Sequence, residues 1–161
     1  MNKLNESMEL LAACGLYCGA CYHYRAGTPE GTHLLEEASQ RELEMEGYTC
    51  QGCRSNKLYI HTGCAECKIR ECTDQKGILH CGACTEFPCE KLTTFQNDGR
   101  IHHLDILKNL AELNRKGNDL WLQEQARLWT CSCGNRFSWY EETCSRCGSG
   151  LPSYGSDPTR K

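Results

Sequence analysis

The sequence predicts a small, irregular α+β fold, and three observations support this class. The chain is short, with 161 residues, yet contains 15 cysteines, several times the share in an ordinary domain. Ten of these cysteines form five C-x2-C pairs. Leucines recur at helical spacing over residues 102–129. We therefore expect short helices between cysteine turns, a pair of longer helices and a C-terminal hairpin, in a fold organised by metal ions.

The composition divides the chain into four regions. Residues 1–100 hold most of the cysteines and predict a multi-metal domain. Residues 101–129 predict a helical segment that packs on this domain. Residues 130–150 contain the last four cysteines and predict a small separate module. Residues 151–161 are rich in glycine, proline and serine and predict a flexible tail.

Apolar spacing and helix-breaking residues predict the helices. Residues 3–13 have apolar side chains on one helical face. The acidic stretch Glu30–Glu46 predicts a second helix, with Pro29 in its first turn and Gly47 at its end. In the leucine-rich region, Gly117 and the asparagine after it predict a break between two helices.

Charge and hydropathy exclude several classes of protein. The net charge is −3, and no block of basic residues is present, so we expect no nucleic-acid partner. No apolar run approaches the roughly 18 residues that a membrane helix needs. The first thirteen residues include Glu6 and Glu9 and lack the basic start and apolar stretch of a secretion signal. We therefore expect a cytoplasmic protein.

The expected compartment decides what the thiols do. Disulfides persist in oxidising compartments, whereas a reducing cytoplasm favours metal ligation for paired thiols. A C-x2-C pair on a tight turn presents two sulfurs to one ion, and two such pairs complete a tetrahedron. The odd total of 15 agrees, because a complete set of disulfides would leave one thiol over.

The C-terminal cysteines form the most specific local pattern. Cys131-x-Cys133-Gly is followed, ten residues later, by Cys144-x2-Cys147-Gly. Two cysteine turns joined by a short aromatic segment resemble a zinc ribbon, in which the joining segment forms a hairpin. The glycine after each pair suits such a turn because it takes positive φ at low cost. The single-residue gap between Cys131 and Cys133 departs from the usual two and puts the turn geometry in question.

Eleven thiols remain outside this pattern. They are Cys14, Cys18, Cys21, Cys50, Cys53, Cys64, Cys67, Cys72, Cys81, Cys84 and Cys89. Within them Cys64-x2-Cys67-x4-Cys72 recurs as Cys81-x2-Cys84-x4-Cys89. Eleven is one short of three four-ligand sites, so a histidine is a candidate for the missing ligand: His80 first, then His61 or His23. Alternatively there are two closed sites with three thiols left over, or one site keeps an open position. The spacing leaves open which cysteines share an ion.

Several segments of the chain resemble one known family. The segments CGLYCGACYHYRAG, CQGCR, CKIREC and KGILHCGACTEFPCEKL, in this order, resemble a cysteine-rich family of unknown function, DUF3795. The resemblance covers roughly residues 12–95, and the ribbon-like segment is similar to a tail that some members carry. The resemblance implies several bound metal ions, generally regarded as zinc, and no established reaction.

These observations favour a protein with three to four zinc ions that are mainly structural. We expect an interaction or regulatory module with a protein partner; the oligomeric state is left open. The sequence contains no G-x-G-x-x-G, no G-x4-G-K-[ST] and no H-E-x-x-H motif, so no common catalytic pattern supports an enzyme. His102, His103 and Asp105 could supply a base and a carboxylate, but their place at the start of a helix favours capping or a surface role.

Two alternatives remain. The first is an iron–sulfur protein for redox chemistry or electron transfer, because thiolates suit iron clusters as well as zinc. Cys14-x3-Cys18-x2-Cys21 has the spacing of radical enzymes, although Ala20 stands where an aromatic residue is usual and the chain is too short for their barrel. The second is a metal-thiolate enzyme with one open zinc site, in which a cysteine is the activated nucleophile.

Overall fold

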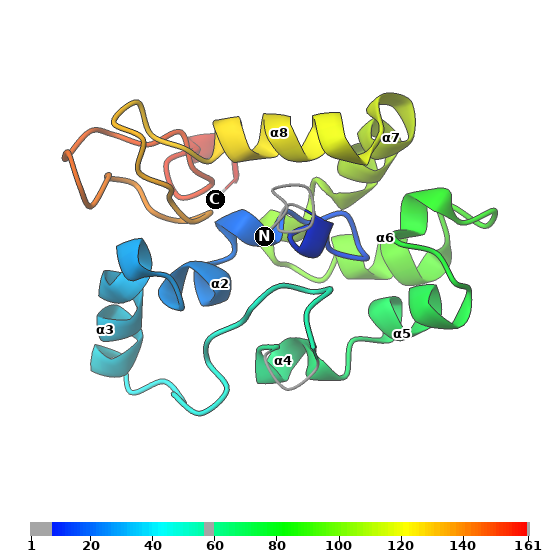
Figure 1. Ribbon diagram of the computed structural model, residues 1–161, viewed down its shortest axis with the longest axis horizontal. Helices are drawn as coiled ribbons and strands as arrows, with labels where there is room; N and C mark the ends of the chain where they lie inside the picture. The colour runs from blue at the N-terminus through cyan, green and yellow to red at the C-terminus, as the bar shows by residue number, and fades with distance from the viewer. Residues whose placement is uncertain (1–7, 57–59, 161) are drawn as a thin grey trace.

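The structure is a computed structural model that describes residues 8–56 and 60–160. It shows a small, mostly helical fold (Figure 1). The helices are α2 (Tyr22–Ala26), α3 (Thr32–Gln40), α4 (Thr62–Ala65), α5 (Lys68–Gln75), α6 (Glu90–Gln96), α7 (Ile106–Lys116) and α8 (Asn118–Leu128). Short 3-10 turns lie at Cys18–Ala20, Pro29–Gly31, Cys81–Ala83, Ile101–His103 and Pro158–Arg160.

Strand pairing in the described part of the chain is limited to three isolated bridges. They join Leu11 with Tyr17, Thr130 with Arg136, and Thr143 with Gly150. The predicted helix at residues 3–13 lies partly outside the described residues. Within its described part, the chain leaves the helical conformation after Glu9.

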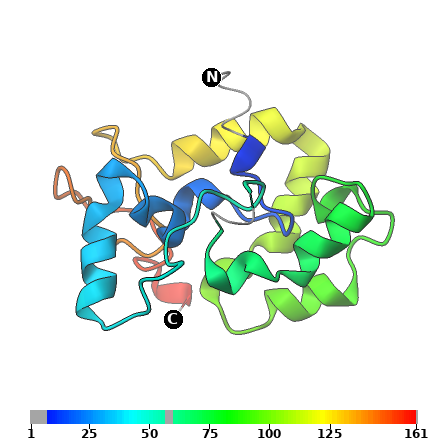
Figure 2. The same cartoon turned by 60° about the horizontal axis from the view of Figure 1, so that its bottom comes forward.

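The longest helices line one side of the molecule. In Figure 1, α8 runs along the top and meets α7 at its right-hand end, while α4, α5 and α6 lie on the right below them. The C-terminal loops lie at the other end, beside α2 and α3, and Figure 2 shows the same arrangement from below. The first cysteine loop, residues 14–21, therefore lies in the middle, between the helical pair and the smaller helices.

The predicted helical pair is confirmed. Gly117 has φ +85° and separates α7 from α8, a backbone conformation that favours glycine. The inward faces of the two helices bury large apolar side chains, among them Leu110, Leu113 and Trp121. This burial, at about 25 cal/mol for each Å2 of apolar surface, gives the molecule an apolar core in addition to any metal ions.

Helix α7 packs directly on the first cysteine loop. Gly15 has φ +88°, and a Cβ atom there would lie 2.7 Å from Cγ of Leu110, so a larger residue would force the two apart. The Asn109 Nδ2 group donates a hydrogen bond of 2.9 Å to the Gly15 carbonyl. Close approach and this hydrogen bond together fix the loop on the helix.

The acidic helix ends earlier than its sequence predicts. Helix α3 stops at Gln40, and Glu42 takes a left-handed conformation with φ 57°. The Leu43 amide donates to the Ala38 carbonyl (3.1 Å) and the Glu42 amide to the Ser39 carbonyl (3.0 Å), the two bonds of a Schellman motif. The prediction that Gly47 ends the helix was therefore wrong, because this motif closes the helix five residues before it.

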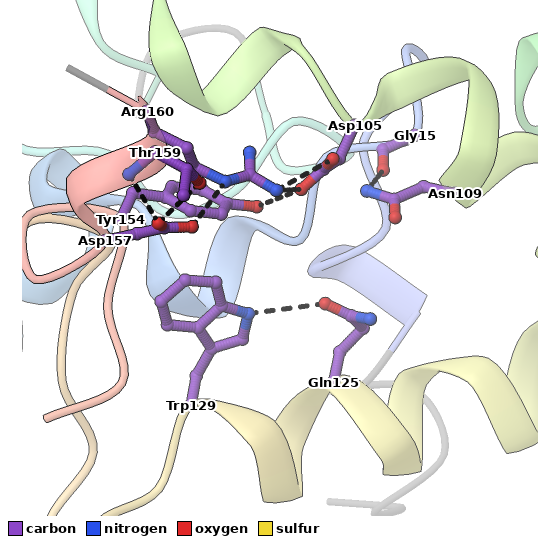
Figure 3. A network of polar contacts seen from close by, with 9 residues as sticks. All are labelled: Gly15, Asp105, Asn109, Gln125, Trp129, Tyr154, Asp157, Thr159 and Arg160. Atoms are coloured by element: carbon purple, nitrogen blue, oxygen red, sulfur yellow. Dashed lines mark hydrogen bonds and ion pairs between the residues drawn. The ribbon is translucent and has the colours of Figure 1, made fainter.

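Residues 151–160, in which the sequence predicts a flexible tail, are packed on α7 and α8. Leu151 belongs to the apolar core. Figure 3 shows that Asp105 accepts hydrogen bonds from Tyr154 Oη (3.2 Å) and from Arg160 Nη2 (3.0 Å). The Tyr154 ring also lies edge-on to Trp129, with ring centroids 5.2 Å apart. Side chains that a composition-based argument counts as tail residues thus make specific contacts.

Among the described residues, no helix combines the length and the apolar character needed to cross a membrane.

Candidate metal centre

Four C-terminal sulfurs form a compact cluster. The Sγ atoms of Cys131, Cys133, Cys144 and Cys147 all lie within 4.8 Å of one another. Cys131 and Cys147 are 3.6 Å apart, and Cys133 and Cys144 are 3.8 Å apart. Four sulfurs at the ~2.3 Å zinc–sulfur distance in a tetrahedron would be about 3.8 Å apart. The cluster therefore has the size that holds one metal ion.

Two tight turns build this cluster. The Gly134 amide donates to the Cys131 carbonyl (2.8 Å), and the Gly148 amide donates to the Cys144 carbonyl (2.9 Å). Both glycines have positive φ, +86° and +74°, as the sequence predicts. The first turn closes over one residue fewer than the second, which is how the chain accommodates the single-residue gap after Cys131. The single-residue gap thus shortens the turn but still allows it to close.

The structure does not show the predicted zinc-ribbon hairpin. One isolated β-bridge flanks each cysteine turn where a ribbon would have a ladder of paired strands, and the segment between the turns goes into the core. Phe137 and Trp139 are buried; the Trp139 amide donates to the Ala20 carbonyl (3.0 Å), and its indole stacks on the His102 ring at 4.4 Å between centroids. Burial of these large aromatic side chains stabilises the observed path of the segment between the turns more than a short exposed hairpin would stabilise it.

The four thiols influence one another's ionisation. Hydrogen bonds with the side chain and the backbone of Ser149 lower the pKa of Cys147 to about 6. The Asn135 amide lowers the pKa of Cys133, but burial and the three neighbouring sulfurs together outweigh it and raise that pKa to about 11. The Cys147 thiol therefore ionises readily, whereas the Cys133 thiol resists ionisation. A bound cation removes this conflict, because it stabilises all four thiolates together.

All 15 cysteines lie in the described ranges, and each is a free thiol. Two of the family-type segments, Cys18–Cys21 and Cys81–Cys84, share the letters CGAC and the same 3-10 turn. In each turn the amide of the second cysteine donates to the carbonyl of the first, at 3.0 and 3.1 Å. The two turns therefore share one backbone geometry, in keeping with their identical sequence.

One group of thiols surrounds the first cysteine loop. The Cys53 amide donates to Sγ of Cys18 at 3.4 Å. Burial, and then the nearby Cys53 thiol, raises the pKa of Cys14 and of Cys18 well above the usual range. Cys67 is a further neighbour of both Cys14 and Cys53. Cysteines far apart in sequence thus meet in a buried, poorly solvated place where only a cation makes ionisation favourable.

A second group combines thiols with histidines. Burial raises the pKa of Cys21 to about 12 and that of Cys64 to about 11, and Cys50 is a neighbour of both. The His23 and His61 rings lie 3.5 Å apart between centroids, and each Nδ1 atom faces a backbone carbonyl, at 2.8 and 3.2 Å. Metal-binding histidines commonly hold a carbonyl in this way through the nitrogen that does not bind the ion.

One cavity is lined by the remaining thiols, which are Cys72, Cys81, Cys84 and Cys89. His80, the first histidine candidate, is buried, and its Nε2 atom lies 3.1 Å from the Asn118 Oδ1 atom. Its Nδ1 atom has no hydrogen-bond partner in the described structure. A ligand role for His80 stays a prediction. The contact of the His80 ring with Asn118 of α8 gives no support for metal binding.

The N-terminal thiols are less tightly gathered than the C-terminal four. Across residues 8–56 and 60–160, the C-terminal cluster is the one group of three or more such ligand atoms within 4.8 Å of one another. Any ion that binds the N-terminal thiols must therefore draw their side chains together.

The histidine pair before α7 has a structural role that the sequence did not indicate. His103 binds Asp98 at 2.9 Å, whereas Asp105, the carboxylate considered from the sequence, binds Arg160. Burial lowers the pKa of His102 to about 3. Both histidines are buried, so the surface role considered for them was wrong. Sequence reasoning missed Asp98, and nothing local in the sequence pairs it with His103.

Another cavity offers no comparable chemistry. It has a volume of about 610 Å3 and lies between α7, α8 and residues 152–160. Its acidic side chains are already paired: Asp105 with Arg160, and Glu112 and Glu124 with Lys116. These ion pairs fasten the C-terminal segment and the two helices.

Fold and cluster together define a cysteine-rich protein with a site that can hold a metal ion. Residues 10–94, more than half of the chain, match the model of a family described as "Protein of unknown function (DUF3795)". The chain belongs to this family. The match includes all eleven N-terminal cysteines and ends before the C-terminal cluster. Neither the curated proteins nor the solved structures contain a significant match.

Proposed function

We propose that this protein binds three or four zinc ions that hold its fold, and that it acts as an interaction or regulatory module. The observation that carries the proposal is the spacing of the four C-terminal sulfurs, 3.6 and 3.8 Å across two of their pairs. A four-thiolate site without an open position is typical of structural zinc. The N-terminal thiols supply the further ligands.

The choice of zinc over a multi-iron cluster rests on the same distances. Sulfide ions separate the cysteine sulfurs of an iron–sulfur cluster, so these sulfurs lie farther apart than around a single ion. A single iron would fit the same tetrahedron, and metal analysis distinguishes the two metals.

A binding role is favoured over catalysis and over nucleic-acid binding. The C-terminal cluster offers four ligands and leaves no position for a substrate. Each four-thiolate zinc site carries a charge of −2, which adds to a chain already at −3. Such a charge favours a protein partner over a phosphate backbone. Free thiols throughout the chain support a reducing compartment such as the cytoplasm.

Elemental analysis of anaerobically purified protein tests the proposal. We expect three or four zinc ions per chain and a colourless solution. A brown protein whose visible absorption is bleached by dithionite would replace the proposal by an iron–sulfur protein. Fewer than two zinc ions in a colourless sample would contradict metal-based folding. One thiol that alkylates much faster than the rest in the loaded protein would favour the enzyme instead.

A further inference from the structure

A cavity next to α5 and α6 is lined by four cysteines. It has a volume of about 350 Å3. Cys72 comes from α5, Cys81 and Cys84 lie at the two ends of a 3-10 turn, and Cys89 directly precedes α6. Three separate pieces of backbone thus direct four potential metal ligands into one hollow.

We propose that Cys72, Cys81, Cys84 and Cys89 form a second four-thiolate metal site, separate from the C-terminal cluster and occupied by zinc. Four soft sulfur ligands are the set that zinc takes in closed sites. Of the two carboxylates that also line the cavity, Glu86 is paired with Lys76 and Glu90 is exposed. The proposal extends the function proposed above and can fail while the C-terminal site stands.

A lysine and apolar side chains complete the surroundings of this site. The Lys76 ammonium donates a hydrogen bond to Sγ of Cys84 at 3.3 Å and also pairs with Glu86. A hydrogen bond from a cation stabilises the thiolate form and offsets part of the −2 charge of a loaded site. Ile69, Phe87 and Leu92 are among the apolar side chains that line the cavity and limit the access of water.

The site divides the internal repeat unequally. Its ligands are all three cysteines of the second copy together with Cys72, the last cysteine of the first copy. Of the other two, Cys64 is a neighbour of Cys50, and Cys67 is a neighbour of Cys14 and Cys53 as well as of Cys81. The proposed site therefore uses four of the six cysteines of the repeat.

Ion counting in variants tests the ligand set. C81S/C84S and C72S/C89S should each bind one zinc ion fewer than the wild type. The quadruple variant should also lose one ion, because all four cysteines serve the same ion. If the quadruple variant loses two ions, or C81S/C84S loses none, the assignment is wrong.

The first copy of the repeat provides the matched control. C64S/C67S removes a pair with the same C-x2-C spacing, and its combination with C81S/C84S should lose more ions than C81S/C84S alone. If the combination loses no more, the two pairs share an ion and the assignment is overturned. Retention of the helical circular-dichroism signal shows that the variants are folded, and comparison with C144S/C147S identifies the C-terminal ion.

A measurement on the unaltered protein gives an independent check. Mass spectrometry after alkylation should find Cys72, Cys81, Cys84 and Cys89 protected in the zinc-loaded chain and exposed together as a chelator removes zinc. Alkylation of Cys72 or Cys89 at full loading would overturn the proposal, even if the C-terminal cluster stays protected.

Discussion

The two cysteine-rich regions of this chain assemble their sulfurs in different ways. The C-terminal four lie on two turns within 17 residues, from Cys131 to Cys147, and are within 4.8 Å of one another. The N-terminal eleven extend from Cys14 to Cys89 and meet through long-range packing. Closing a short loop costs less conformational entropy than closing a long one. Local turns can therefore assemble a site by themselves, whereas the distant thiols need an ion to draw them together.

The two regions are nevertheless joined through the core. The segment between the C-terminal turns contacts the backbone of the first cysteine loop through Trp139 and Ala20. Changes in the C-terminal cluster should therefore alter the stability of residues 10–94, the region that matches the family. Variants of the two regions can therefore test how each group of sulfurs assembles and how the regions are connected.

The largest effect is expected from C144S/C147S, which removes half of the C-terminal cluster. The variant should lose one metal ion, and residues 130–150 should lose their hydrogen-exchange protection. Apparent binding free energies of structural zinc reach about 10–16 kcal/mol in small peptides, more than any single side chain supplies. Zinc content and a thermal melt measure the result. Ser132→Ala/Arg146→Ala changes the residues between the cysteines and should keep the ion; full retention of zinc in C144S/C147S would refute the site.

Trp139→Ala should weaken the connection between the regions: the variant keeps the backbone amide that donates to Ala20 but loses the indole that packs against Tyr22 and His102. Trp139 is 4 % exposed, and removing a buried aromatic side chain costs about 3–5 kcal/mol. Urea unfolding of the zinc-loaded protein measures the change. The control is Leu128→Ala, which truncates an apolar side chain that is 52 % exposed and should change stability by less than about 0.5 kcal/mol. Equal effects of the two variants would show that the connection is unimportant.

Acid should weaken the core around His102. Burial lowers the pKa of His102 from 6.5 to about 3 in the folded chain, so the unfolded state binds the proton more readily. Stability from this group is present above pH 6.5 and is lost as the pH falls from 6.5 towards 3. At pH 5 the loss is about 2 kcal/mol.

The urea midpoints of wild type and His102→Gln at pH 7.5 and pH 5 measure this effect. The wild type should lose more stability between the two pH values than the variant does. Zinc content determined at both pH values separates this effect from metal release. A parallel decrease in both proteins would assign the acid sensitivity to other groups.

The smallest effect is expected from Lys76→Gln in the second proposed site. Loss of the hydrogen bond to Cys84 should speed the transfer of one zinc ion to a competing chelator by a few-fold, with the C-terminal ion unaffected. Lys68→Gln, at the start of α5 and paired with the exposed Glu71, is the control and should behave as the wild type. Identical transfer rates in all three proteins would remove Lys76 from the site.

Local rules allowed part of this structure to be predicted from the sequence. The break at Gly117, the positive φ of Gly134 and Gly148, and the grouping of the last four cysteines all follow from spacing within about 20 residues. Such features depend on the backbone preferences of glycine and on turn geometry.

Features that depend on distant packing were not predictable. The aromatic segment around Trp139 predicted a hairpin, but its large side chains are buried in the apolar core instead. The early end of α3 required a non-glycine residue, Glu42, in the left-handed region, which sequence rules do not favour. The ligand sets of the N-terminal thiols depend on which loops meet, and C-x2-C spacing says nothing about that.

The contact between Trp139 and Ala20 has a consequence for the order of events during synthesis. Ala20 leaves the ribosome between two cysteines of the first loop, more than 100 residues before its partner Trp139. The growing chain must therefore expose this side of a thiol-rich loop until Trp139 has been made. The segment around Trp139 then covers that side of the loop.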